Sequence, residues 1–250
     1  MKTFSIKKYR VFFIFIFFVS CSTVKTKPPA QFSCVQIKTE NYVLLSMQKI
    51  TDEKMPVRIY VEGDGNAYTS KGYATDDPTP KSYFLRNVAF NDPNPNVVYL
   101  ARPCQFIKDK NYDKTDWTTG RFSQKIVDNV AQAIKQIADG NETVLIGYSG
   151  GALLTGLIIN RYGQQLNTVK WITIAGLLNH TKWTRYFNYV SLKDSLDLNE
   201  IPDIKQTHYI AEKDSVVPYK LTLDAIGDKD YVLIRNAAHG KGITINYNDN

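Results

Sequence analysis

Residues 143–151 read Thr-Val-Leu-Ile-Gly-Tyr-Ser-Gly-Gly, and this stretch decides the fold. Its first four residues are apolar or β-branched, which is typical of a buried strand in a parallel sheet. The segment from Gly150 to Tyr162 is mostly apolar and predicts a helix. Between them, Gly147-x-Ser149-x-Gly151 predicts a tight, strained turn, because glycine tolerates backbone conformations closed to other residues. The alternative is an ordinary glycine-rich turn whose serine caps the helix.

A turn of the first kind prepares a serine for chemistry. It lifts the Ser149 hydroxyl out of the carboxyl edge of the sheet, and it aims the peptide N–H of Gly150 at a developing oxyanion. A serine hydroxyl is inert without a base and a third group that orients the base. The rest of the sequence must therefore supply a histidine and a carboxylate.

The chain offers three histidines as the base. After a serine on such a turn, the acid follows first and the histidine second. Only His239 lies beyond the last expected strand, so it is our candidate. His208 opens a strand and is expected to be structural. His180 follows a strand end, where it either rims the pocket or lies in an exposed loop.

The acid is expected directly after the strand at 207–211. Asp214 stands three residues beyond that strand and precedes a turn that begins the next helix, so it is our candidate. Glu212 is the main rival, because it lies two residues nearer the strand.

A second oxyanion donor is expected from the loop after the strand at 57–61. Glu62-Gly63-Asp64-Gly65 occupies that loop, and its two glycines let the backbone approach a ligand closely. The peptide N–H of Asp64 is the candidate donor. The alternative is a simple Gly-Asp-Gly turn.

Strand-like and helix-like segments alternate along most of the chain. Strands are expected at 57–61, 96–101, 143–146, 169–175, 207–211 and 231–234, an antiparallel hairpin at 33–38 and 42–49, and helices at 121–139, 150–162 and 219–226. This order predicts an α/β fold, with a mostly parallel sheet and helices on both faces. We expect one domain over 33–250. The connection at 176–206 is longer than ordinary loops and predicts a small lid.

Several further motifs occur along the chain in one order. They are Glu62-Gly63-Asp64-Gly65, residues 100–105 (LARPCQ), Asp116-Trp117-Thr118 with Arg121-Phe122-Ser123, residues 147–151, Ala175-Gly176 with His180 and Trp183, and His208-Tyr209 with residues 214–218 (DSVVP). Over about residues 56–240 this series resembles a family of small bacterial α/β-hydrolase-fold proteins, often predicted lipoproteins. The resemblance implies a Ser-Asp-His hydrolase, here with Ser149, Asp214 and His239. It leaves the substrate open. Residues 102–105 and 117–123 either shape the pocket wall or serve in helix capping and loop packing.

The N-terminus predicts export. Residues 1–10 carry four cations and no acid, residues 11–19 are all apolar, and Ser20-Cys21-Ser22 follows. This pattern predicts a signal peptide over 1–20, and the apolar run is too short for a permanent membrane span. Val19-Ser20-Cys21 resembles a bacterial lipobox, which implies a lipid on Cys21, a tether over 21–32 and an outer-membrane lipoprotein facing the periplasm or the surface. The alternative is plain secretion to the periplasm.

Composition and cysteine count narrow the class of protein. Hydrophobic residues make up 43% and charged residues 22%, which excludes collagen-like, coiled-coil and disordered chains. Removing residues 1–20 lowers the net charge from +7 to +3, which gives no support for a nucleic-acid partner. Cys34 and Cys104 either form a disulfide in an oxidising compartment or remain buried thiols. No metal-ligand spacing or phosphate loop is present, so we expect neither metal nor cofactor.

The sequence thus predicts an exported serine hydrolase that cleaves an ester or a related acyl bond of a small or envelope-derived substrate. One alternative is a peptidase or amidase with the same residues. Another is a non-catalytic binding lipoprotein of the cell envelope that retains the fold.

Overall fold

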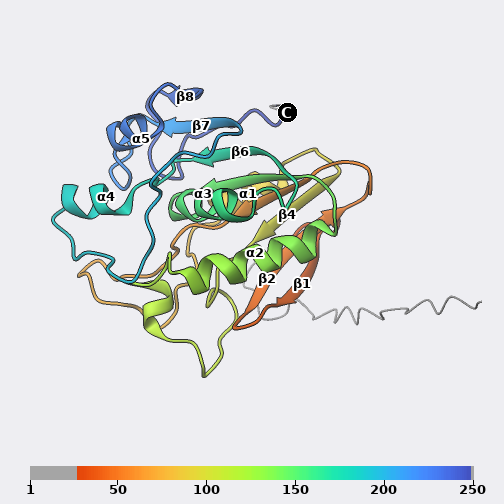
Figure 1. The fold of residues 1–250 in the computed structure, drawn as a ribbon, viewed down its shortest axis with the longest axis horizontal. Coiled ribbons are helices and arrows are strands. Elements are labelled where there is room, and N and C mark those ends of the chain that lie inside the picture. Colours follow the sequence, from red (N-terminus) through yellow and green to blue (C-terminus); the bar gives the residue numbers. More distant parts are fainter. Residues whose placement is uncertain (1–26, 249–250) are drawn as a thin grey trace, which may run out of the picture.

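The structure is a computed structural model and describes residues 27–248. The predicted signal peptide and Cys21 lie outside these residues. One eight-stranded sheet runs through the molecule in the order β1-β2-β4-β3-β5-β6-β7-β8 (Figure 1). Its strands are β1 (Ser33–Lys38), β2 (Val43–Ile50), β3 (Val57–Val61), β4 (Asn96–Leu100), β5 (Thr143–Tyr148), β6 (Thr168–Ile174), β7 (Lys205–Ala211) and β8 (Tyr231–Ile234).

The sheet is parallel from β4 to β8, and β1 and β2 add an antiparallel hairpin at one end. The hairpin and the mostly parallel sheet were both predicted, and both are confirmed. Strands β3, β4 and β5 are buried along their whole length. That burial accounts for their almost continuous apolar sequence, since both faces of a central parallel strand are covered.

Helices cover both faces of the sheet, as predicted. They are α1 (Phe84–Phe90), α2 (Gln124–Ala138), α3 (Gly150–Tyr162), α4 (His180–Tyr186) and α5 (Tyr219–Ile226), together with a 3-10 turn, η2 (Lys114–Trp117). Helices α2, α3 and α5 pack on one face. The other face is covered by α1 and by Ile243 and Ile245 of the C-terminal tail.

Two details of the helices differ from the sequence prediction. Helix α1 was not predicted, because it is short and its N-cap residue, Tyr83, makes no side-chain capping bond. Helix α2 begins after the capping residue Ser123, and it ends at Asp139, which adopts the left-handed conformation with φ 47°. Gly140 follows with φ 90°. The left-handed turn therefore spans both residues.

The connection at 176–206 contains α4, which lies beyond the carboxyl ends of the neighbouring strands (Figure 1). Leu192 and Leu198 in this connection are buried in the core on the α2–α3 face. Ser195 binds the same face, because its hydroxyl accepts a hydrogen bond from the Phe122 N–H at 3.1 Å. Within residues 27–248 no helix combines the length and apolar character needed to cross a membrane.

Cys34 and Cys104 are not bridged to each other, so the disulfide that the sequence left open as one of two alternatives does not form. Cys104 is a free, buried thiol. It belongs to the core on the α2–α3 face, whereas Cys34 packs against the core on the opposite face.

Candidate active site

Ser149 stands on a sharp turn between β5 and α3. Its backbone has φ 52° and ψ −123°, a strained conformation for a residue other than glycine. The turn is held because the Ser149 N–H donates to the Ile174 carbonyl on β6 at 3.0 Å. The Ser149 side chain makes no capping hydrogen bond to α3. Ser149 is therefore a half-buried residue on a strained turn and does not act as a side-chain cap of α3.

Asp214 and His239 meet at the carboxyl edge of the sheet. His239 Nδ1 lies 2.7 Å from Asp214 Oδ2. The other oxygen of Asp214 accepts hydrogen bonds from the N–H groups of Val216 and Val217, both at 2.8 Å. These contacts fix the carboxylate after β7 and leave one oxygen for the imidazole. An aspartate held in this way can orient a histidine and stabilise its charged form.

Tyr148, the residue before Ser149, contacts the ring of His239. The Tyr148 ring lies 5.1 Å from the His239 ring, and Phe84 packs on its other side at 5.0 Å. Gly240, with φ 67°, allows the chain after His239 to pass close to Tyr148, since a Cβ there would stand 2.8 Å from the Tyr148 hydroxyl. Sequence reasoning missed this support. Tyr148 occupies a free position of the turn motif, and no spacing links it to Phe84.

The other candidates have different surroundings. The Glu212 carboxylate accepts from the Asn236 N–H at 2.9 Å and so helps to hold the turn before His239. His208 is fully buried between Thr173 at 2.7 Å and Gln206 at 2.9 Å, and burial lowers its pKa to about 4. It is structural, as expected. His180 is buried at the start of α4 and stacks on Phe122, so it is not an exposed loop residue.

The predicted oxyanion residues lie beside Ser149. A Cβ on Gly63 would stand 3.1 Å from the Ser149 Cβ, which places the loop after β3 directly against the turn. A Cβ on Gly150 would stand 2.1 Å from Asp64 Oδ1, so only glycine fits at the first position of α3. The structure therefore brings Gly150 and Asp64 together.

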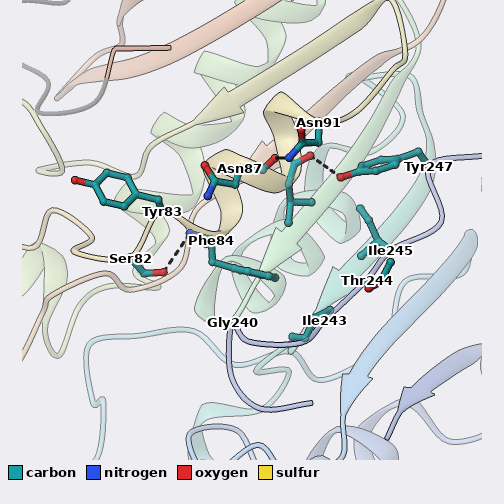
Figure 2. A pocket seen from close by; sticks show the side chains of 11 residues that line it. Ser82, Tyr83, Phe84, Asn87, Asn91, Gly240, Ile243, Thr244, Ile245 and Tyr247 are labelled. Atoms are coloured by element: carbon teal, nitrogen blue, oxygen red, sulfur yellow. Dashed lines mark hydrogen bonds between the residues drawn. The ribbon is translucent and has the colours of Figure 1, made fainter. Parts of the chain in front are cut away.

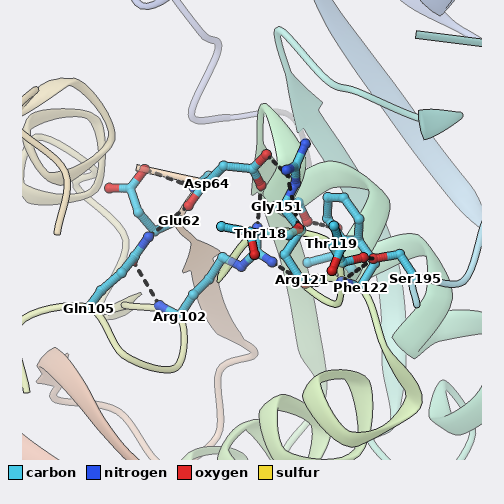
Figure 3. A network of polar contacts seen from close by, with 12 residues as sticks. Glu62, Asp64, Arg102, Gln105, Thr118, Thr119, Arg121, Phe122, Gly151 and Ser195 are labelled. Carbon is cyan, nitrogen blue, oxygen red and sulfur yellow. Dashed lines mark hydrogen bonds and ion pairs between the residues drawn. The ribbon is translucent and has the colours of Figure 1, made fainter. Parts of the chain in front are cut away.

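The side chain of Asp64 is held by two buried arginines. Arg102 pairs with Asp64 Oδ1, and Arg121 Nε lies 2.8 Å from Asp64 Oδ2 (Figure 3). A second guanidinium nitrogen of Arg102 donates to the Arg121 carbonyl. We call Asp64, Arg102 and Arg121 the Asp64 cluster. Both arginines fall in segments predicted either to shape the pocket wall or to pack loops, and their meeting at Asp64 was not predicted.

Glu62 stabilises the loop after β3 through hydrogen bonds. It is buried, and its two carboxylate oxygens accept from the Gly63 N–H and the Tyr99 hydroxyl, each at 2.9 Å. Burial raises the pKa of Glu62 above its ordinary value. A Gln105 amide donates to the Gly63 carbonyl at 2.9 Å. The loop is thus rigid where it approaches Ser149.

An open groove of about 450 Å³ begins beside Gly240 and follows α1 (Figure 2). Phe84 and Ile243 give it apolar surface, while Asn87 and Thr244 give it polar surface. Its lining includes Gly240, the residue after His239, but none of Ser149, Asp214 and His239. Among residues 27–248, no group of three or more His, Cys, Asp or Glu side chains is placed to hold a metal ion.

Solved structures of similar fold come from several organisms. A serine hydrolase without a lid from Xanthomonas campestris is 13% identical, with a TM-score of 0.52, covering 85% of this chain and 88% of that one. A putative lipase from Acinetobacter baumannii is 9% identical, with a TM-score of 0.59 and coverages of 84% and 85%. Mouse α/β hydrolase domain-containing protein 10 is 16% identical, with a TM-score of 0.59 and coverages of 83% and 90%.

No family model and no curated protein sequence matches the chain. Identities this low speak to the fold and not to the reaction. The eight-stranded, mostly parallel sheet with helices on both faces fits the fold of these structures. The protein therefore has the α/β-hydrolase fold.

Proposed function

We propose that the protein is a serine hydrolase that cleaves an ester or a related acyl bond. Ser149 is the nucleophile, His239 the general base and Asp214 the group that orients His239. The peptide N–H groups of Gly150 and Asp64 bind the oxyanion. The observation that carries the proposal is the 2.7 Å contact between Asp214 and His239, together with the contact of the His239 ring with Tyr148, the residue before the strained Ser149.

The reaction follows in two steps. Ser149 Oγ attacks the acyl carbon and passes its proton to His239 Nε2, while the carbonyl oxygen becomes an oxyanion. The tetrahedral adduct then collapses, and the leaving alcohol takes the proton from His239. A water molecule repeats the sequence on the acyl-enzyme, releases the acid and restores Ser149. Asp214 stabilises the imidazolium that exists between proton transfers, through its bond to Nδ1.

Replacing the nucleophile tests this proposal. Ser149→Ala is expected to lower kcat for an activated ester by about 10⁴-fold or more, because only binding and the oxyanion donors remain. A fluorophosphonate probe is expected to label the wild-type protein at Ser149 and to leave Ser149→Ala unlabelled. Thermal unfolding is the control, since removal of one hydroxyl that makes no capping bond leaves the melting temperature nearly unchanged. Full esterase activity in Ser149→Ala would remove the nucleophile from this account.

The same residues serve an amide as well as an ester. Turnover of matched ester and amide substrates decides between an esterase and a peptidase or amidase. A non-catalytic binding protein is the remaining alternative. Folded wild-type protein that resists the fluorophosphonate probe would favour that alternative.

We further propose that the protein is exported and anchored by a lipid on Cys21, at the outer membrane facing the periplasm or the surface. Its support is the sequence: a basic start, nine apolar residues over 11–19 and a serine on each side of Cys21. Cys21→Ala is expected to move the protein from the detergent-extracted membrane fraction to the soluble or uncleaved fraction. Mass spectrometry of the wild-type N-terminal peptide checks the anchor directly. A peptide that begins after residue 21, or carries no lipid mass, contradicts it.

A further inference from the structure

The carboxyl ends of β3 and β4 bury more positive than negative charge. Three guanidinium groups lie there, on Arg86, Arg102 and Arg121, which are 2%, 4% and 2% exposed. Two carboxylates face them, on Glu62 and Asp64. With every group ionised, the region holds one positive charge in excess. Burial raises the pKa of Glu62, and protonation of Glu62 only enlarges the excess.

A neighbouring acidic residue does not cancel this charge. Asp116 lines the same small cavity as Asp64, Arg102 and Arg121. Its carboxylate lies 2.7 Å from Lys125 Nζ, so it already has a cation of its own. The surplus charge therefore stays with the Asp64 cluster and Arg86.

Asp64 connects the two arginines to the serine turn. One oxygen of its carboxylate presses on Gly150, where a Cβ would stand only 2.1 Å away, and the other lies 2.8 Å from Arg121 Nε. The backbone just before Asp64 touches the turn itself, because a Cβ on Gly63 would stand 3.1 Å from the Ser149 Cβ. The Asp64 side chain and the backbone before it thus both contact the turn that carries Ser149.

Burying charge without a partner is costly for a folded protein, and such costs persist where they serve chemistry. We propose that Arg102 and Arg121 are positioning residues of the oxyanion site and act through Asp64. They hold the Asp64 carboxylate against Gly150, which fixes the Asp64 N–H toward the reacting oxygen. Their surplus charge also stabilises the oxyanion when it forms. This inference rests on the proposed function.

The contacts of Arg102 require an arginine. One of its terminal nitrogens pairs with Asp64, and the other donates to the Arg121 carbonyl. A lysine has a single charged nitrogen and cannot span both partners. Arg121 faces Asp64 through Nε and donates from Nη1 to the Thr118 carbonyl at 3.3 Å, so a lysine there keeps the charge beside Asp64 and loses the bond to Thr118.

The test measures hydrolysis and binding of a transition-state analogue in Arg102→Gln and Arg121→Gln. We expect kcat for an activated ester to fall about 10- to 100-fold, with KM within about threefold, because the lost interaction acts on the oxyanion and not on the bound ester. Phenylboronic acid adds Ser149 Oγ to its boron and becomes a tetrahedral anion, while the serine proton passes to His239. Its Kd is expected to rise by the same factor as kcat falls.

Arg58→Gln is the matched control. Arg58 is also a buried arginine paired with an aspartate, Asp92, at 2.7 Å, but it lies at the amino ends of the strands. The Arg58→Gln variant is expected to have a lower melting temperature and unchanged values of kcat and of the boronate Kd. The lysine variants give the second contrast, since Arg121→Lys should regain most of kcat and Arg102→Lys should not.

Each outcome decides the inference. Folded Arg102→Gln and Arg121→Gln with wild-type kcat and boronate affinity overturn it, while Ser149 labelling in the same samples keeps the hydrolase proposal intact. Wild-type protein that neither labels nor hydrolyses esters overturns both. If the glutamine variants do not fold, Asp64→Asn replaces them, because it keeps the side-chain shape and the peptide N–H. A tenfold lower kcat at unchanged KM supports the inference, and an unchanged kcat contradicts it.

Discussion

Buried arginine–aspartate ion pairs lie at both ends of the β3–β4 strand pair, but the ratio of arginine to aspartate differs between the two ends. At the amino ends, Arg58 Nε lies 2.7 Å from Asp92 Oδ2, and the Tyr60 hydroxyl donates to the same oxygen at 2.6 Å. Burial alone would raise the pKa of Asp92, but Arg58 beside it holds that pKa below its ordinary value. One fully buried cation meets one buried anion there, and half-buried Lys49 donates to the Asp92 backbone carbonyl at 2.8 Å. At the carboxyl ends, two arginines share Asp64.

The difference separates a contact made for stability from one made for chemistry. In a buried pair of one cation and one anion the two charges cancel, so the pair has little electrostatic effect on other groups. A cluster with an excess of positive charge still attracts negative charge. In the proposed reaction, negative charge develops at the nearby serine turn. Four predictions follow this division, in order of decreasing effect.

The largest contrast is expected between two acidic residues after β7. Asp214→Asn should lower kcat by about 10⁴-fold, because an amide at this position favours the wrong tautomer of His239. Glu212→Gln should stay within about threefold of wild type, since its carboxylate serves the Asn236 N–H and not the imidazole. Steady-state kinetics on one activated ester compares them. Equal losses in the two variants would remove Asp214 from the orienting role.

Gly150→Ala tests the close approach at the start of α3. The new methyl group must displace the Asp64 carboxylate, so kcat/KM is expected to fall by about 10²- to 10³-fold, as when an oxyanion donor is lost. Gly227→Ala is the matched control. Gly227 has φ 62° with nothing within 4 Å of its Cβ position, so its variant costs about 1–2 kcal/mol of stability and no activity. Wild-type kinetics in Gly150→Ala would show that the contact is dispensable.

Asp92→Asn tests the amino-end pair. It leaves Arg58 buried without an anion, so the free energy of unfolding is expected to fall by about 3–5 kcal/mol. Urea unfolding measures the change. Below the unfolding transition, kcat should match wild type within about twofold. A parallel loss of kcat would mean that the two ends of the strands are coupled, and that the Arg58–Asp92 pair does not serve stability alone.

The smallest effect concerns His208, which burial keeps neutral. Its folded pKa of about 4 lies below the ordinary value of 6.5, so between these values the unfolded chain binds the proton first. Stability linked to His208 is therefore complete above pH 6.5 and is lost as pH falls toward 4, by about 3 kcal/mol in all. His208→Gln should flatten this part of the stability curve, measured by urea unfolding from pH 7 to 4. An unaltered slope would assign it to other groups.

The sequence predicted those features that local patterns determine. The bounds of β3, β8, α3 and α5 were all predicted from apolar runs and turn residues. The offset after β7 favoured Asp214 over Glu212, and the structure places Asp214 against His239. These inferences succeed because a strand and the few residues after it form one rigid unit.

Features that depend on three-dimensional convergence were missed or wrong. Arg102 and Arg121 come from two loops that only the folded sheet brings to Asp64. The sequence left the Cys34–Cys104 bridge undecided, because residue counts do not reveal which face of the sheet a side chain occupies. Helix α1 lacks both a polar cap and the length that makes a helical pattern recognisable.

The reactivity of the Cys104 thiol can report how often the loop that carries Arg102 opens. The thiol is 3% exposed, and burial raises its pKa to about 12, so it resists modification while the fold is closed. It stands two residues after Arg102 and is the one free cysteine among residues 27–248. The rate at which a thiol reagent reaches Cys104 under native conditions therefore reports how often this loop detaches. A ligand that stabilises the closed loop is expected to slow modification of the Cys104 thiol, even if the protein does not hydrolyse that ligand.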